Sequence, residues 1–145
     1  MTSTISYRIG EVPGEAALEA LYRSVGWQES EPAENLQRAL KQSDWVATAW
    51  HDDALVGLAR VLTDGVMVAY FQELLVHPDY QHQGVGKELL DRYDREFENF
   101  RHQIAVVPSE WARHKLEKRG FRSEPDAMSR MRPLGTWTSN GIRGV

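Results

Sequence analysis

The sequence has no cysteine among its 145 residues. This absence excludes a disulfide framework, a thiolate metal site and a cysteine nucleophile. Long apolar runs are missing too, since none approaches the roughly 18 residues that cross a bilayer. Residues 1–10 also lack the basic-then-apolar pattern of a signal peptide. From these absences we expect a cytoplasmic protein with no membrane partner and no bound metal.

A large excess of either charge is also lacking. Seventeen Lys and Arg residues stand against 21 Asp and Glu residues, which gives a formal net charge of −4. Because nucleic-acid-binding surfaces are usually basic, we expect no nucleic-acid partner. The length suits one compact domain with a sizeable core. We place this domain at residues 1–134 and expect a polar, glycine-containing tail at residues 135–145.

The spacing of apolar residues predicts the order of helices and strands. Alternation and turn signals predict strands at residues 5–12, 44–51, 55–62, 66–76, 103–107 and 121–132. Apolar residues at helical spacing predict helices that begin near residues 15, 32, 85 and 109. The order β-α-α-β-β-β-α-β-α-β indicates an α+β (mixed α/β) fold. We expect a mostly antiparallel sheet flanked by helices, with at least one parallel crossover.

A glycine-containing loop lies between the long apolar strand and the helix after it. The free N–H groups and positive dipole end of a helix N-terminus hold anions well. Glycine lets the backbone approach phosphate oxygens closely, and a lysine adds a charge-assisted contact. A tight turn that needs glycine for its geometry alone is the alternative. The loop reads Gln81, His82, Gln83, Gly84, Val85, Gly86 and Lys87.

Spacing separates this loop from two nucleotide-binding motifs. A Walker A loop needs glycine at position 81 and Ser or Thr after the lysine, where Gln81 and Glu88 stand. A dinucleotide-binding fingerprint needs a third glycine in place of Leu89. The remaining pattern, Gln-x-x-Gly-x-Gly after an apolar strand, resembles the central motif of the GNAT superfamily of N-acetyltransferases. The pair Gly120-Phe121 also resembles the exit of that family's next helix, and the likeness covers about residues 5–132.

This resemblance implies an acyltransferase with acetyl-CoA as its cosubstrate. In the family, amides of the glycine loop bind the CoA pyrophosphate. The preceding strand carries a bulge, splays from the next parallel strand and pairs with the pantetheine arm. One of its amides then stabilises the oxyanion. The cofactor-binding residues implied here are Leu74, Leu75, Val76, Gln81, His82, Gln83, Gly84, Val85, Gly86, Lys87 and Ser109.

The resemblance is less complete at the proton-transfer residues. Glu73 is the candidate base, directly or through a water, although a solvent-facing strand glutamate is the alternative. The family commonly protonates the CoA thiolate with a tyrosine, and Leu116 stands at that position. Leucine cannot donate a proton. His114, Tyr80 or water are weak candidates to replace it.

The sequence gives the fewest signals for the acceptor. Trp27 and Tyr70 are candidates to bind it through aromatic contacts, with core packing as the alternative. We expect direct transfer of the acetyl group to a primary amine of a small molecule. The alternatives are a catalytically weakened CoA-binding regulatory or interaction module, and a protein acetyltransferase acting on lysines or N-termini. A homodimer in which the C-terminal strand and tail pack between subunits is also open.

Overall fold

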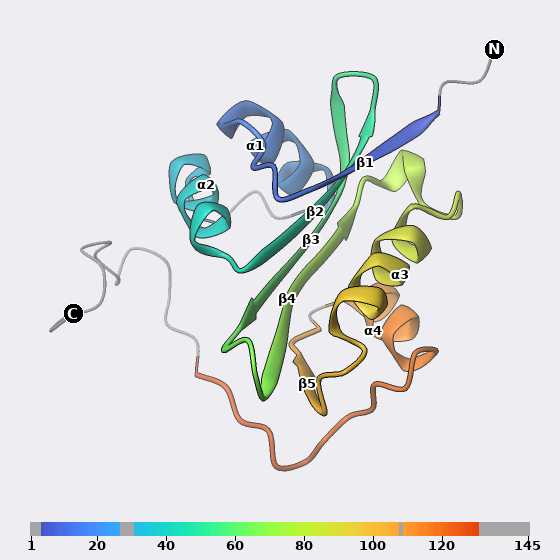
Figure 1. The fold of residues 1–145 in the computed structure, drawn as a ribbon. Helices are drawn as coiled ribbons and strands as arrows, with labels where there is room; N and C mark the ends of the chain where they lie inside the picture. Colours follow the sequence, from blue (N-terminus) through green and yellow to red (C-terminus); the bar gives the residue numbers. More distant parts are fainter. Residues whose placement is uncertain (1–3, 27–30, 108, 131–145) are drawn as a thin grey trace, which may run out of the picture.

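The chain forms a sheet with helices on both faces. A computed structural model describes residues 4–26, 31–107 and 109–130. Its elements are β1 (Ile5–Ile9), α1 (Glu15–Ser24), α2 (Ala33–Gln42), β2 (Trp45–His51), β3 (Ala54–Thr63), β4 (Val68–Val76), the 3-10 turn η1 (Pro78–Tyr80), α3 (Val85–Phe97), β5 (His102–Ala105) and α4 (Glu110–Glu117). This order matches the predicted one up to α4 (Figure 1).

The five strands lie in the order β1-β2-β3-β4-β5. The first three pairings are antiparallel and the pairing of β4 with β5 is parallel. The α+β prediction of a mostly antiparallel sheet with one parallel crossover is therefore confirmed. The crossover is made by α3, which returns the chain from the end of β4 to the start of β5.

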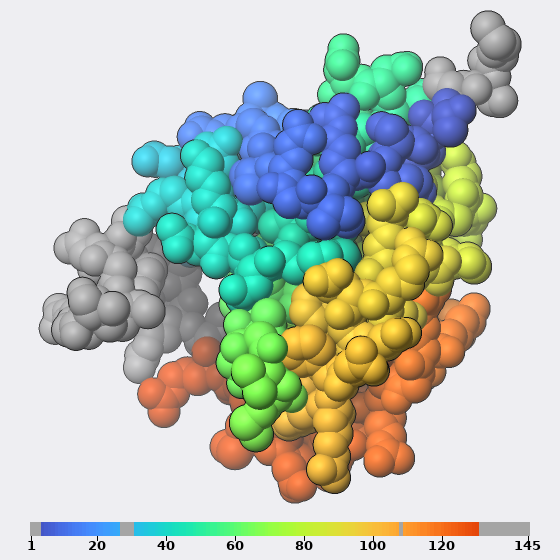
Figure 2. All heavy atoms as spheres, viewed as in Figure 1, coloured from blue at the N-terminus to red at the C-terminus, as the bar shows by residue number. Residues whose placement is uncertain are grey.

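The two faces of the sheet have separate apolar cores. On one face Leu18 and Tyr22 of α1 and Leu36 of α2 pack against Leu58 and Leu75. On the other face α3 and α4 pack against the sheet through a cluster that includes Phe71, Leu74, Leu89, Tyr93 and Leu116. In Figure 2, the atoms of α1 and α2 lie on the left of the molecule and those of α3 on the right, on opposite sides of the sheet. The helical spacing of these apolar residues is what directs each helix onto its face.

Side-chain hydrogen bonds shift the predicted start of β4. The strand begins at Val68, two residues later than predicted, because Asp64 Oδ1 takes up the preceding amides. It accepts hydrogen bonds from the backbone N–H groups of Val66, Met67 and Val68 at 2.9, 2.8 and 3.2 Å. An aspartate that caps a turn in this way competes with the sheet ladder. β1 and β5 also end earlier than predicted, at Ile9 and Ala105.

The strand predicted at residues 121–132 is wrong for the part that the structure describes. Residues 121–130 contain no strand, and residues 122–130 are exposed. After the half-buried Phe121 the sequence offers no alternating apolar face, and Pro125 has no N–H to donate. Residues 131–145, with the tail expected at 135–145, lie outside the described residues. No helix within the described ranges is long and apolar enough to cross a membrane.

Candidate active site

The first feature of the site is a bulge in β4. Arg60 of β3 lies opposite Glu73, and the next residue, Val61, lies opposite Phe71. Gln72 is therefore an extra residue on β4, and an extra residue reverses the alternation of side chains after it. Phe71 and Leu74 accordingly share the core beneath α3. Glu73 is turned to the opposite face of the sheet, toward α1.

The second feature is the divergence of β4 from β5. The parallel pairing runs from Val68 and His102 to Phe71 and Ala105, where β5 ends. β4 continues to Val76, so its edge at residues 72–76 has no strand neighbour within the described chain. A cleft of about 310 Å³ opens along this edge. It is lined by Ser24, Val25, Phe71, Gln72, Glu73, Leu74, Leu75, Val76, Pro78, Gln81, Val106, Val107, Ser109, Trp111, Ala112 and Leu116.

The loop at the end of β4 runs from the cleft, which Pro78 and Gln81 line, to the N-terminus of α3. Gln81 links this loop to the end of β4, because its side-chain amide donates a hydrogen bond to the Val76 carbonyl oxygen at 3.1 Å. His82 and Gly84 have left-handed backbone conformations, with φ of 64° and 85°. The first helical hydrogen bond of α3 runs from Glu88 N to Gly84 O. The amides of residues 85–87 therefore have no carbonyl of their own helix to bond to, which suits an anion.

Gly86 sets how closely α4 approaches this helix N-terminus. A Cβ atom at Gly86 would lie 3.2 Å from Cη2 of Trp111 and 3.8 Å from Cγ2 of Val76. The indole of Trp111 thus packs directly on the first turn of α3. A loop whose free amides suit an anion, next to an unpaired strand edge, fits a ligand with a diphosphate and an extended amide-containing arm.

Glu73 is buried in a polar cluster and does not face the solvent. Its side chain is 11% exposed and that of Arg60 is 12% exposed. The Tyr22 hydroxyl donates a hydrogen bond to Glu73 Oε2, and Arg60 Nη2 lies 3.4 Å from Glu73 Oε1. Burial, followed by the neighbouring Glu73 carboxylate, raises the pKa of Tyr22 far above its ordinary value. The phenol therefore stays protonated at neutral pH and acts as a donor.

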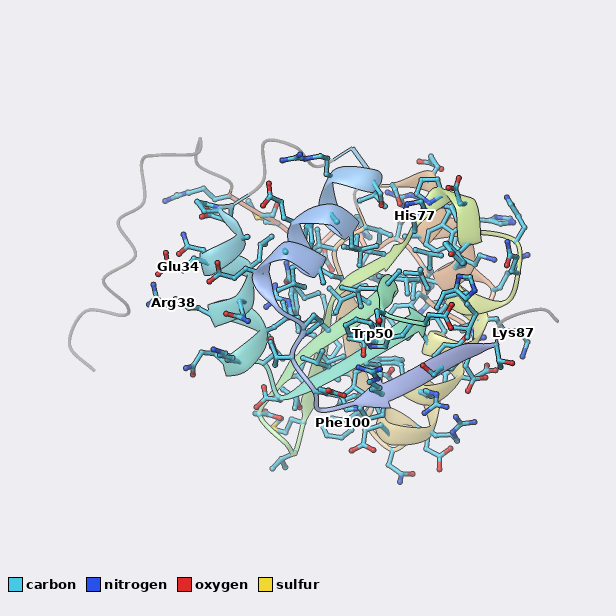
Figure 3. The ribbon with its side chains drawn as sticks, turned by 90° about the horizontal axis from the view of Figure 1, so that it is seen from above. Glu34, Arg38, Trp50, His77, Lys87 and Phe100 are labelled. Carbon is cyan, nitrogen blue, oxygen red and sulfur yellow. The ribbon has the colours of Figure 1, made fainter. Side chains whose placement is uncertain are left out.

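The residues predicted to bind the cofactor divide into two groups. Leu74, Leu75, Val76, Gln81 and Ser109 line the cleft. The remainder form the loop and the first turn of α3, where His82, Gln83, Gly84 and Lys87 are exposed and Val85 and Gly86 are buried. In Figure 3, His77 and Lys87 lie across the molecule from Glu34 and Arg38 of α2.

Two of the residues predicted to bind the cofactor make polar contacts within the fold. Lys87 Nζ lies 2.9 Å from Asp91 Oδ2, one turn further along α3. Ser109 caps α4, because its Oγ accepts a hydrogen bond from the Ala112 amide at 3.1 Å.

The candidate acids are not brought together with Glu73. His114 is exposed on α4, and it does not line the cleft in the described structure. The Tyr80 hydroxyl lies 2.6 Å from His51 Nδ1, outside the cleft lining. Leu116 does line the cleft and is 2% exposed.

Tyr70, one of the two acceptor candidates, is not among the residues that line the described cleft. Tyr70 is half-buried on β4 ahead of the bulge, and burial raises its pKa. Trp27 lies outside the described residues.

Sequence reasoning did not assign roles to three residues that shape the site. Arg60 gave a usable signal, because it is the one charged residue inside the apolar run at residues 55–62. Tyr22 was indicated as an apolar residue of its helix and as one of several aromatic residues near the acceptor, but not as a partner of Glu73. Trp111 gave no signal, since its contact with Gly86 joins residues 25 positions apart in the chain.

Curated relatives of the chain have acetyltransferase names. The uncharacterized N-acetyltransferase ycf52-like of Prochlorococcus marinus is 38% identical over 77 residues, which are 50% of this chain and 42% of the relative. Histone acetyltransferase TAP1 of Glycine max is 35% identical over 89 residues, which are 54% of this chain and 38% of the relative. The chain thus spans less than half the length of either relative.

Solved structures and the family comparison agree with these names. A GNAT family acetyltransferase from Streptococcus pneumoniae has a TM-score of 0.71 and 28% identity, covering 95% of this chain and 100% of its own. An aminoglycoside N-acetyltransferase solved in complex with CoA has a TM-score of 0.64, covers 92% of this chain and 97% of its own, and at 17% identity shows the fold alone. The model of the acetyltransferase (GNAT) domain family matches residues 25–130. With that match over most of its length, the chain belongs to the GNAT acetyltransferase family.

Proposed function

We propose that the protein is an N-acetyltransferase that moves the acetyl group of acetyl-CoA directly to the primary amine of a small molecule. The observation that carries this proposal is the free edge of β4 at residues 72–76, which borders the cleft and leads to the N-terminus of α3. A strand edge has evenly spaced N–H and C=O groups that suit an extended amide-containing ligand. The helix N-terminus suits the phosphates at the end of that ligand.

The cosubstrate site is assigned to residues on both sides of the cleft. Backbone groups of Leu74, Leu75 and Val76 would pair with the pantetheine arm, and Ser109 would contact it from α4. Amides of residues 82–87 would hold the diphosphate. Lys87 is 72% exposed, so its ammonium can leave Asp91 for a phosphate at little cost.

The chemistry follows from groups that face the same cleft. Bound acetyl-CoA supplies a thioester whose carbonyl carbon is open to attack by an amine. A backbone N–H on the free edge of β4 would stabilise the negative charge that develops on the carbonyl oxygen. Glu73 would remove the proton that the amine must lose. Without a cysteine to carry the acetyl group, the transfer is assigned as a single direct step.

The acceptor is assigned to the class of small amines by comparison. A solved protein with the same fold is named as an aminoglycoside N-acetyltransferase. A relative named as a histone acetyltransferase keeps a protein lysine as the competing acceptor.

A CoA-binding module without catalysis is the second candidate. It is favoured by Leu116, which places an apolar side chain in the cleft where the family commonly has an acidic phenol. The candidate replacements His114 and Tyr80 stand outside the cleft lining. CoA thiolate is a tolerable leaving group, so water can protonate it after departure.

Thiol release separates these candidates. The protein is mixed with acetyl-CoA and, in turn, with small aliphatic amines, aryl amines and lysine-containing peptides, and free thiol and acetylated product are measured. We expect amine-dependent thiol release, strongest with a small amine, and a large loss in Glu73→Gln. Tight acetyl-CoA binding without thiol release for any amine would refute the enzyme assignment. Faster transfer to peptides than to small amines would assign a protein acceptor.

A further inference from the structure

We infer that Tyr22 and Arg60 are positioning residues that hold the Glu73 carboxylate in place at the cleft, where it takes the proton of the acceptor amine. The inference rests on the proposed function and extends it to two residues outside the family's glycine motif. It follows from the contacts of Glu73 with two separate elements, α1 and β3.

The bulge in β4 brings Glu73 to this cluster. With strict alternation Glu73 would share the face of Phe71, in the apolar core beneath α3. The extra residue Gln72 turns Glu73 toward α1 instead, where Tyr22 is 2% exposed and lies within hydrogen-bonding reach. Glu73 still lines the cleft, so the carboxylate is at once buried among its partners and within reach of a ligand.

Both carboxylate oxygens have a donor. Oε2 accepts from the Tyr22 hydroxyl, and Oε1 lies 3.4 Å from Arg60 Nη2. Arg60 is held in turn by the Ser43 hydroxyl at the end of α2, 3.3 Å from its Nη1. Each oxygen keeps a second lone pair for an ammonium or a water.

The titratable and charged side chains near Glu73 come from α1, β3 and β4. Tyr22 approaches from α1, Arg60 from the paired strand β3, and Tyr70 lies on β4 itself within the field of Arg60. A carboxylate buried to this extent without partners would take up a proton and could no longer act as a base. The donor hydroxyl and the guanidinium both favour the ionised form. Both donors therefore support Glu73 as a base at the point where it lines the cleft.

The nitrogen of the acceptor ammonium loses two protons in the reaction, and Glu73 takes the first of them. An acceptor ammonium gives its first proton to the Glu73 carboxylate and becomes a free amine. Its nitrogen forms a bond to the acetyl carbon while the carbon–sulfur bond breaks and the electron pair leaves with sulfur. The second nitrogen proton goes through water to the CoA thiolate, which departs as the thiol. Glu73 returns its proton to solvent before the next turnover.

The experiment compares Tyr22→Phe, Arg60→Met and Arg60→Lys with the wild-type protein. One acceptor is used throughout, so the titration of the amine itself is common to all variants. We expect the acid limb of the pH profile of kcat/KM to move to higher pH, by about one unit in Tyr22→Phe and by about 1–3 units in Arg60→Met. Arg60→Lys keeps the positive charge and should restore most of the wild-type profile.

A matched control removes a different buried hydroxyl. Tyr93 is a residue of α3 that is buried in the core between this helix and the sheet, 0% exposed, and its hydroxyl donates a hydrogen bond to Gln103 Oε1 at 2.7 Å. Tyr93→Phe loses one hydrogen bond, as Tyr22→Phe does, but should leave the acid limb in place. A role that is only structural would lower the stability of both variants and shift neither profile.

A direct titration of Glu73 keeps the test decisive if turnover is weak. The ¹³Cδ resonance of Glu73 is followed with pH in glutamate-labelled protein and assigned by its loss in Glu73→Gln. An upward displacement of the midpoint is expected in both variants, at least as large in Arg60→Met as in Tyr22→Phe. If both midpoints equal that of the wild-type protein, the inference is overturned while the proposed function stands. Full activity in Glu73→Gln would instead remove the base assignment in the proposed function.

Discussion

Substituting Gly86 by alanine tests the packing that brings α3 and α4 together at the loop. The added Cβ would lie 3.2 Å from Cη2 and 3.3 Å from Cζ2 of Trp111, so the indole must shift by a few tenths of an ångström. Overpacking of this kind costs about 1–3 kcal/mol. Against it, alanine in place of glycine stabilises a helix by about 0.5–1 kcal/mol, and less in the first turn. We therefore expect Gly86→Ala to destabilise the protein by about 1 kcal/mol.

The clash can be removed without changing position 86. Trp111→Leu lacks both ring atoms that the new Cβ would meet. In that background Gly86→Ala should be neutral or stabilising, so urea unfolding of the four proteins should give a coupling free energy of about 1 kcal/mol or more. Calorimetric titration with acetyl-CoA should show weaker binding in Gly86→Ala than in the wild-type protein. An equal cost of Gly86→Ala in both backgrounds would refute this packing argument.

Two further predictions concern the surroundings of the cleft. Hydrogen bonds from Lys87 and Arg119 lower the pKa of Asp91, so the contribution of Asp91 to stability is present at neutral pH and is lost as the pH falls below the usual range of an aspartate. The difference in free energy of unfolding between the wild-type protein and Asp91→Asn should therefore be largest near pH 7 and shrink below about pH 4. A difference that is independent of pH would contradict the assignment. Ser109→Ala should lower the free energy of unfolding in urea by about 0.5–2 kcal/mol, because it removes the cap of α4. Ser123→Ala removes an exposed serine hydroxyl and should be close to neutral. Equal effects of the two substitutions would show that the cap contributes nothing.

The parts of the fold that the sequence predicted well depend on local patterns. The start of α1 at residue 15 was predicted correctly because Leu18, Leu21 and Tyr22 repeat at helical spacing. The loop before α3 was recognised from Gly84 and Gly86, whose spacing is a local property. Element bounds failed where a side chain competed with the backbone, as Asp64 does before β4.

The parts of the site that the sequence could not predict depend on contacts between distant segments. Glu73 was assigned from its place before the strand edge, but its partners come from residues 51 and 13 positions away. The bulge at Gln72 has no signature in composition, since an extra residue is visible only in the register with β3. The expected strand at residues 121–132 failed because Phe121 is followed by polar residues and Pro125, so one apolar residue was given too much weight.

The most direct test of the account is backbone hydrogen exchange with and without acetyl-CoA. If the free edge of β4 and the N-terminus of α3 bind the cosubstrate, amides within residues 72–76 and 84–87 should exchange more slowly when acetyl-CoA is bound. The outer edge of β1, on the far side of the sheet, should be unchanged. Binding of acetyl-CoA without protection of either segment would contradict the central claim that this edge and this helix N-terminus form the cosubstrate site.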